Sequence, residues 1–158
     1  MTTLRDMVQT TAEARQQLLD SLAAAIEEIG VALASLGAAY EQLDVQRADE
    51  LEETLFRPVQ RAYGRARRTH SEFAARHGMP AREFEPAPPG LASIGAKVFI
   101  ENAVIAVGKA NTELASLQDS LLPVEVGDAD LRAGLAELRS LIGDLPQRAR
   151  EVVRTIGR

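Results

Sequence analysis

A long heptad stripe in the first third of the chain constrains the fold more than any other feature. Large apolar residues recur there at alternating steps of four and three, at Leu22, Ile26, Ile29, Leu33, Leu36, Tyr40 and Leu43. This spacing is typical of the buried seam of a coiled coil or helical bundle. The stripe continues less regularly toward the N-terminus, where Arg15 interrupts it. We therefore predict one helix from about Thr3 to Leu43.

A second segment, from about Ala48 to His77, also has helical periodicity. Its apolar face consists of Leu51, Leu55, Val59, Ala62, Ala66 and Phe73. Acidic residues crowd its start and arginines crowd its end, which is the order that the helix macrodipole favours. Pro58 lies inside the segment and has no N–H to donate, so we expect a kink or break there. Gly78 is a suitable residue for the position just after the last turn.

Residues 79–90 hold four prolines and cannot form a helix. A connection of this length either carries function or crosses between distant helix ends. Beyond it we predict a third helix from about Leu91 to Leu122, ended by Pro123. Its centre, from Val98 to Val107, is apolar over most of the helix circumference. A helix of this kind is buried on more than one side, which suggests contact with a second subunit.

A fourth segment begins at Asp128, and its apolar residues Leu131, Leu135, Leu138, Ile142 and Leu145 again step by four and three. Gly143 to Pro146 indicate a stop and a restart, with Asp144 as a cap. These segments predict an all-α fold, an elongated antiparallel four-helix bundle with kinks near Pro58 and Pro146. The chain would be a single domain of residues 1–158, with one hairpin over 1–78, a proline-rich connection over 79–90 and a second hairpin over 91–158.

Composition excludes several classes of function. The 158 residues include no cysteine, so disulfides, thiolate metal sites and cysteine nucleophiles are excluded. The net charge of −5 argues against a general nucleic-acid binder, which is usually strongly basic. The N-terminus lacks the pattern of a signal peptide, and the longest apolar runs fall short of the roughly 20 residues of a membrane span. We therefore expect no transmembrane segment and a cytoplasmic location.

The charge is unevenly distributed, and its one basic block is a candidate binding site. Residues 1–55 carry a net charge of −8, whereas residues 56–84 carry +5. Within the basic block, Arg57, Arg61, Arg65 and Arg68 form a stripe along one helix face. The stripe is either a strip that binds phosphate, acidic lipid or nucleic acid, or a solvated face. The simpler interpretation is a solvated face with the pairs Glu53–Arg57 and Arg68–Glu72 and contacts to the acidic first helix.

Polar residues elsewhere give weaker candidates. His70 and His77 are seven residues apart and share a helix face, but no third metal ligand stands at a helical spacing, so we expect two partly exposed helix-end histidines and no metal. Glu101 and Asn102 interrupt the most apolar part of the third helix and are a candidate ligand- or partner-binding patch. Arg15 is a candidate partner for Glu101 across the bundle.

No catalytic motif appears, so we expect neither an enzyme nor a cofactor. The pattern favours an interaction or scaffolding module that associates as a homodimer or with another protein. Val98, Ile100, Val104 and Ile105 of the apolar third helix are the expected oligomer interface. Two alternatives remain open at this point. One is a bundle that holds a small apolar molecule or lipid, and the other is anion or nucleic-acid binding through the arginine stripe, although nucleic acid is the less favoured ligand.

Overall fold

The computed structural model describes residues 4–86, 88–90 and 93–156, and over these ranges the ordered structure is helical, with no strand. The predicted all-α class is confirmed. The elements are α1 (Leu4–Glu41), α2 (Val45–Leu51), the π-helical turn η1 (Glu52–Phe56), α3 (Arg57–Arg76), α4 (Ala96–Asp119), α5 (Leu122–Glu125), α6 (Ala129–Ile142) and α7 (Leu145–Ile156).

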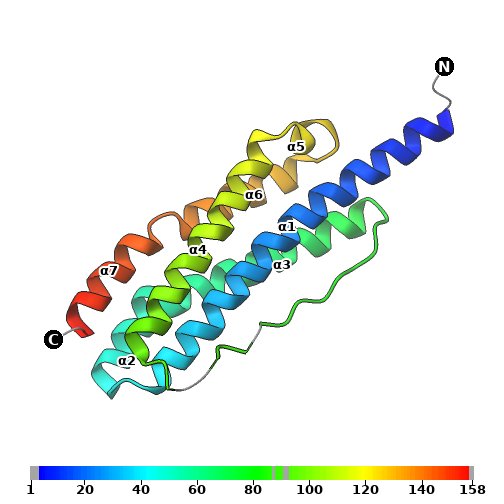
Figure 1. Ribbon diagram of the computed structural model, residues 1–158. Helices are drawn as coiled ribbons and strands as arrows, with labels where there is room; N and C mark the ends of the chain where they lie inside the picture. Colours follow the sequence, from blue (N-terminus) through cyan, green and yellow to red (C-terminus); the bar gives the residue numbers. More distant parts are fainter. Residues whose placement is uncertain (1–3, 87, 91–92, 157–158) are drawn as a thin grey trace.

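The long helices lie side by side, as Figure 1 shows. α1 and the α6–α7 pair run in one direction, and α3 and α4 run in the other. α1 packs on both α3 and α4, α6 packs on α3, and α7 packs on α4, so each of these neighbouring pairs is antiparallel. The described parts of the connection between α3 and α4, residues 77–86, 88–90 and 93–95, run along the outside of the helices toward the start of α4 (Figure 1).

The most extensive contact in the molecule joins α1 and α4, and small side chains make it possible. On α1 the buried alanines Ala25, Ala32 and Ala39 recur every seven residues. On α4 the buried alanines are Ala103, Ala106 and Ala110. Alanine side chains at every second turn of α1 and at successive turns of α4 let the two antiparallel backbones approach closely over several turns.

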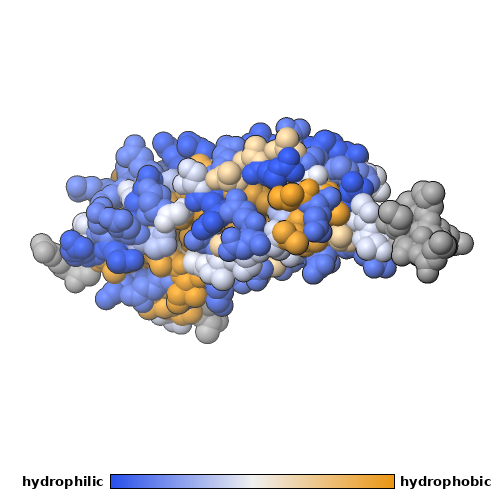
Figure 2. Space-filling model, turned by 90° about the horizontal axis from the view of Figure 1, so that it is seen from above, coloured by the Kyte–Doolittle hydropathy of each residue, from blue (hydrophilic) through white to orange (hydrophobic). Residues whose placement is uncertain are grey.

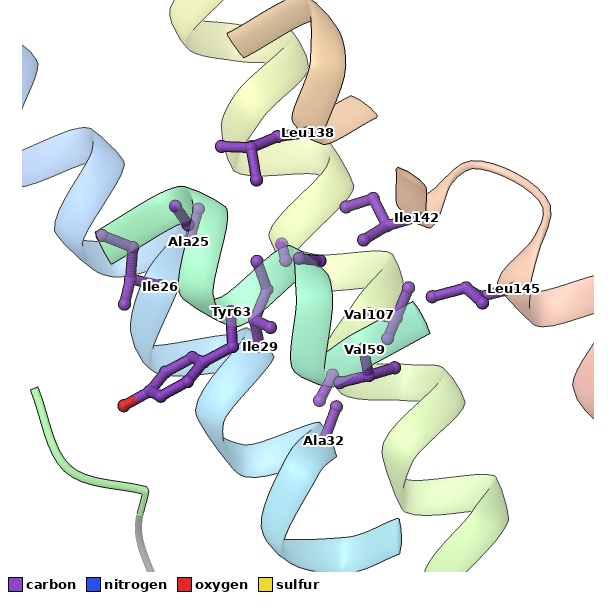
Figure 3. Close-up of a cluster of buried hydrophobic side chains, with 14 of the residues drawn as sticks. Ala25, Ile26, Ile29, Ala32, Val59, Tyr63, Val107, Leu138, Ile142 and Leu145 are labelled. Carbon is purple, nitrogen blue, oxygen red and sulfur yellow. The ribbon is translucent and has the colours of Figure 1, made fainter. Parts of the chain in front are cut away.

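Larger apolar side chains fill the space that these two helices share with α3, α6 and α7 (Figure 3). The predicted stripe supplies Leu22, Ile26, Ile29 and Leu36, which are all buried, whereas Leu33 and Leu43 are half-buried and Tyr40 is exposed. The predicted faces of the second and fourth segments are buried throughout, from Leu51 to Phe73 and from Leu131 to Leu145. The periodicity therefore predicted most of the core, and it failed at the C-terminal end of the first stripe.

The second helical segment starts three residues earlier than predicted and contains no break. Asp44 caps the first turn, because its carboxylate accepts a hydrogen bond from the Arg47 N–H at 2.9 Å. At Pro58 the chain neither breaks nor leaves the helix. Instead, η1 widens the preceding turn, and the Arg57 N–H donates to the Glu52 carbonyl five residues back. This turn accommodates the missing N–H of the proline.

The helix ends around the α3–α4 connection follow simple backbone rules. α3 ends in a Schellman motif, in which Gly78 has a φ of +63° and the Met79 N–H donates to the Ala74 carbonyl at 2.8 Å. α4 begins at Ala96 and not near Leu91, since Gly95 has a φ of +60°, which a helix does not allow. Leu91 itself lies outside the described residues.

The end of α4 is also earlier than predicted. The helix stops at Asp119, four residues before Pro123, and the Ser120 hydroxyl donates to the Leu117 carbonyl at 2.6 Å. Pro123 lies in the separate short helix α5. The predicted stop and restart near Pro146 is confirmed, because α6 ends at Ile142 and α7 begins at Leu145.

α1 has the length and composition of a membrane span, contrary to the expectation from its short apolar runs. The segment Thr10–Glu41 has a mean hydropathy of 1.6 over its most apolar window. Of that window, 56% is buried inside the structure. The apolar side chains that give this signal therefore largely pack against other helices of the chain, as in the core helix of a folded domain.

The crossing of α3 and α6 depends on one glycine, which gives a test of the packing. A Cβ atom at Gly134 would lie 2.8 Å from the Thr69 side chain, whereas a Cβ at Gly64 would meet nothing within 4 Å. Gly134→Ala should therefore destabilise the protein by about 1–3 kcal/mol through overpacking. Gly64→Ala should stabilise it by about 0.5–1 kcal/mol, because alanine favours the helix. Urea denaturation of both variants measures this difference, and equal effects would contradict the described crossing.

Candidate functional site

The four residues predicted as an oligomer interface do not share one face of α4. Ile100 is fully buried in the core of its own chain, so it is not available to a partner, and Val104 is half-buried against that core. Val98 and Ile105 point outward and are 43% and 58% exposed. The prediction is therefore wrong for Ile100, because the apolar circumference of α4 divides between the core and the outer surface.

The expected polar patch at Glu101 and Asn102 is not buried. Both residues are exposed on the outer side of α4. The expected pairing of Arg15 with Glu101 is also wrong, since the Arg15 Nε donates to the Val126 carbonyl at 3.1 Å. Arg15 therefore holds the turn after α5 against α1, and Glu101 belongs to an open helix face.

The outer face of α4 carries a regular row of charges around one apolar residue. Steps of four residues place Lys97, Glu101, Ile105, Lys109 and Glu113 along a single ridge, and all five are exposed. We call this row the α4 ridge. Gly108 lies next to it, with open space where a Cβ would be. A hollow of about 590 Å³ between α1 and α4 includes Ile105, Gly108 and Lys109 in its lining.

Other exposed apolar residues are scattered, and a largely hydrophilic surface surrounds them. Figure 2 shows one face of the molecule, where apolar patches interrupt the hydrophilic surface. Val31 of α1 is 38% exposed and lines a second hollow beside the α4 ridge, together with Ile105 and Lys109. Exposed apolar groups beside a charged rim are typical of interaction surfaces.

The predicted arginine stripe divides into paired and open residues. Arg57 lies 3.9 Å from Glu52, and the Arg65 Nε donates to Glu137 of α6 at 2.7 Å. The predicted pairs Glu53–Arg57 and Arg68–Glu72 do not form, and the partner of Arg65 is α6 and not the first helix. Arg61 and Arg68 are exposed and have no carboxylate within 4 Å among the described residues.

A hollow of about 560 Å³ separates the arginine-bearing side of α3 from the α3–α4 connection. It is lined by Gln60, Arg61, Gly64, Arg65, Arg67, Arg68 and Ser71 of α3, and by Arg82, Glu83 and Phe84 of the connection. We call it the arginine hollow. The sequence analysis did not include Arg67 and Arg82 in the candidate site. Helical periodicity groups the residues of one helix face, and Arg82 comes to this face only through the path of the connection.

The two histidines have separate environments. His70 is only 3% exposed, which corrects the expectation of a partly exposed residue, and its ring meets that of Phe84 edge-on at 5.1 Å. Its Nδ1 has no hydrogen-bond partner among the residues that the structure describes. Burial lowers the pKa of His70, and the nearby positive charge of Arg82 lowers it further, while Asp20 opposes these effects. No group of three metal-ligating side chains occurs in the described ranges.

Because burial favours the neutral form of His70, we expect the free energy of unfolding to decrease at acidic pH. The folded state holds the pKa below the ordinary value of 6.5, so this contribution is complete above pH 6.5 and is lost as the pH falls toward the folded pKa. His70→Leu should remove that part of the pH dependence. Denaturant unfolding from pH 8 to pH 5 measures it, and an unchanged slope in the variant would show that His70 does not cause it.

His77 takes part in a polar link between α3 and α6. Its Nε2 lies 2.8 Å from Asp128, which also accepts two hydrogen bonds from Arg76 at 2.8 and 2.9 Å. Asp128 additionally caps α6, because it accepts a hydrogen bond from the Leu131 N–H at 2.8 Å. These hydrogen bonds, with that from Arg76 the strongest, hold the pKa of Asp128 well below its usual range.

Replacing Asp128 separates its charge from its capping role. Asp128→Asn keeps an oxygen that can cap α6 but loses the charge that faces Arg76. We expect a loss of about 1.5–3 kcal/mol at pH 7, as for a hydrogen bond to a charged group. Because the folded pKa is lowered, the wild-type advantage should shrink as the pH falls below 3.8 and should vanish only below the folded pKa. Parallel unfolding curves at pH 7 and pH 2 check this.

One apolar hollow among the described residues lies in the interior of the fold, and it is small. An apolar hollow between α1, α3, α4 and α7, lined in part by Leu36, Val59 and Ala149, has a volume of about 10 Å³. That volume holds at most about one water molecule. This hollow therefore gives no support to the alternative of a small apolar molecule held between the helices.

Comparison of the chain with protein-family models, with curated proteins and with solved structures finds no match. A function is therefore inferred from the surfaces of the chain itself. The α4 ridge and the arginine hollow are the two surfaces whose chemistry is specific enough to support one.

Proposed function

We propose that this protein is a homodimerising interaction module and not an enzyme, and that two copies meet through the α4 ridge. The observation that carries the proposal is the order of charges along the ridge. From Lys97 to Glu113 the order is positive, negative, apolar, positive, negative. Each charge has an opposite charge at the same distance on the other side of Ile105.

A dimer with a twofold axis beside Ile105 would pair every charge of the ridge with an opposite charge of the second copy. An isologous interface brings each surface patch against its own copy in reversed direction. With the helices antiparallel, Lys97 faces Glu113 of the second copy, and Glu101 faces Lys109. Each of these contacts occurs twice by symmetry, and the two Ile105 side chains meet at the centre. A parallel arrangement in register would bring like charges together, so the pattern favours the antiparallel one.

The spacing also fits a common mode of helix packing. Rows of residues four apart form ridges inclined by about 26° to the helix axis, and two such ridges pack side by side when the helices cross at about −50°. A ridge needs a groove beside it in the partner. Gly108 and the hollow of about 590 Å³ along α1 leave that groove open.

The proposal extends to the architecture of each subunit. The antiparallel contacts of α1 with α3 and α4, of α3 with α6 and of α4 with α7 support an elongated antiparallel four-helix bundle with one long crossover. The ridge lies on the outer side of α4, where a second bundle can dock without rearrangement. A module of this kind joins two copies of itself and leaves its other faces free for a protein partner.

Charge reversal tests the ridge. Glu101→Lys and Lys109→Glu should each place like charges opposite one another and weaken the dimer about tenfold or more. The double variant restores opposite charges and should recover the wild-type association. Because a single helix face gives a small interface, we expect a dissociation constant on the order of micromolar. Sedimentation equilibrium at low and high salt measures it, and salt should weaken the wild-type dimer.

Matched controls separate the ridge from the general surface. Ile105→Asp should abolish the dimer, whereas Val124→Asp introduces the same charge at another exposed apolar residue, 72% exposed in α5, and should leave it intact. Circular dichroism checks that both variants keep their helices. A wild-type protein that stays monomeric at 1 mM, or a dimer unaffected by Ile105→Asp, would overturn the proposal.

A further inference from the structure

The arginine hollow combines several features of a built anion site. Five of its ten lining residues are arginines, and Glu83 is its one carboxylate. Arg65 and Arg82 are engaged elsewhere, with Glu137 and Glu27. Arg61, Arg67 and Arg68 have no carboxylate within 4 Å in the part of the chain that the structure describes. The hollow therefore gathers like charges that its own walls do not neutralise.

The shape of the hollow leaves these guanidinium groups accessible. Gly64 forms part of its lining, and a Cβ atom there would have nothing within 4 Å. Arg61, Arg67 and Arg68 stand three or four residues from Gly64, so they surround a bare patch of the α3 surface. The hydroxyl-bearing residue Ser71 lies one turn further along the same side.

The opposite wall of the hollow is the α3–α4 connection, and contacts to α1 and α3 hold it in place. Arg82 pairs with Glu27 of α1 and lies over the Phe84 ring, 5.1 Å from its centre. Phe84 in turn packs edge-on against the buried His70. Arg67 lies over the ring of Tyr63 at 5.3 Å, which orients its guanidinium group. Both walls are therefore held by contacts to residues outside the lining, namely Glu27, Tyr63 and His70.

We propose that the arginine hollow binds a ligand through a phosphate or diphosphate group. Planar guanidinium groups donate paired hydrogen bonds to phosphate oxygens, and several converging cations favour a group with two or more negative charges over a single carboxylate. The volume of about 560 Å³ accommodates such a group and part of the molecule that carries it. This site uses no residue of the α4 ridge, so it does not depend on dimer formation.

Calorimetric titration with sodium pyrophosphate at low ionic strength tests the site. The wild-type protein should bind one equivalent per chain, and the Arg61→Gln/Arg68→Gln double variant should lose at least tenfold in affinity. Arg150→Gln removes another exposed arginine, in α7 and outside the hollow, and this variant should bind as the wild type does. Glu83→Gln removes the opposing carboxylate and should bind several-fold more tightly. A purely structural role of these residues would not produce that gain.

Further measurements identify the source of the phosphate and exclude a diffuse effect. Vesicles containing phosphatidic acid that bind with the same arginine dependence would support the site and assign the phosphate to a lipid headgroup, whereas pyrophosphate binding alone would assign it to a free ligand. Duplex DNA that binds while pyrophosphate does not would overturn the proposal, because it would indicate a basic surface without a site. Equal pyrophosphate affinity in the wild type and the double arginine variant would also overturn it.

Discussion

The close approach of α1 and α4 is the constraint on which the rest of the structure depends. Buried alanines at every second turn of α1 and at successive turns of α4 leave little between the two backbones, so this pair forms a thin seam. Large side chains have no room in the seam and lie to one side of it, where they meet α3, α6 and α7. The same arrangement turns one side of α4 fully outward and creates the α4 ridge.

At the α3–α6 crossing a single glycine allows the close approach that the alanines allow between α1 and α4. Gly134 meets the side chain of Thr69 there, and the guanidinium group of Arg65 spans the same crossing to Glu137. The α3–α4 connection packs on the remaining side of α3 through Phe84 and closes the arginine hollow. Both candidate surfaces therefore result from the way the helices are packed. The α4 ridge lies on the side of α4 that faces away from the core, and the arginine hollow needs both α3 and the connection.

The sequence predicted the helices and their buried faces well, because periodicity reports which residues avoid water. It predicted the helix ends less well, since they depend on single groups such as the Asp44 carboxylate, the Ser120 hydroxyl and the positive φ of Gly95. For α4, apolar residues surround the helix, and periodicity could not say that Ile100 faces the core while Ile105 faces outward. That distinction required the positions of the neighbouring helices.

The two candidate sites also differ in how far the sequence predicts them. The charges of the α4 ridge stand in the sequence at regular steps of four, and their opposite order about Ile105 is readable there. The arginine hollow is different, because Arg82 and Phe84 belong to a proline-rich connection without periodicity. Only the path of that connection along α3 brings them opposite Arg61 and Arg68.

The ion pair between Arg76 and Asp128 also favours one relative orientation of α3 and α6. Arg76 lies in the last turn of α3, where backbone carbonyls give the helix end a partial negative charge, and Asp128 lies at the start of α6, where backbone N–H groups give a partial positive charge. Each side chain therefore carries the sign that its own helix end favours. The ion pair joins the negative end of the α3 dipole to the positive end of the α6 dipole, and this favours the antiparallel packing of α6 on α3.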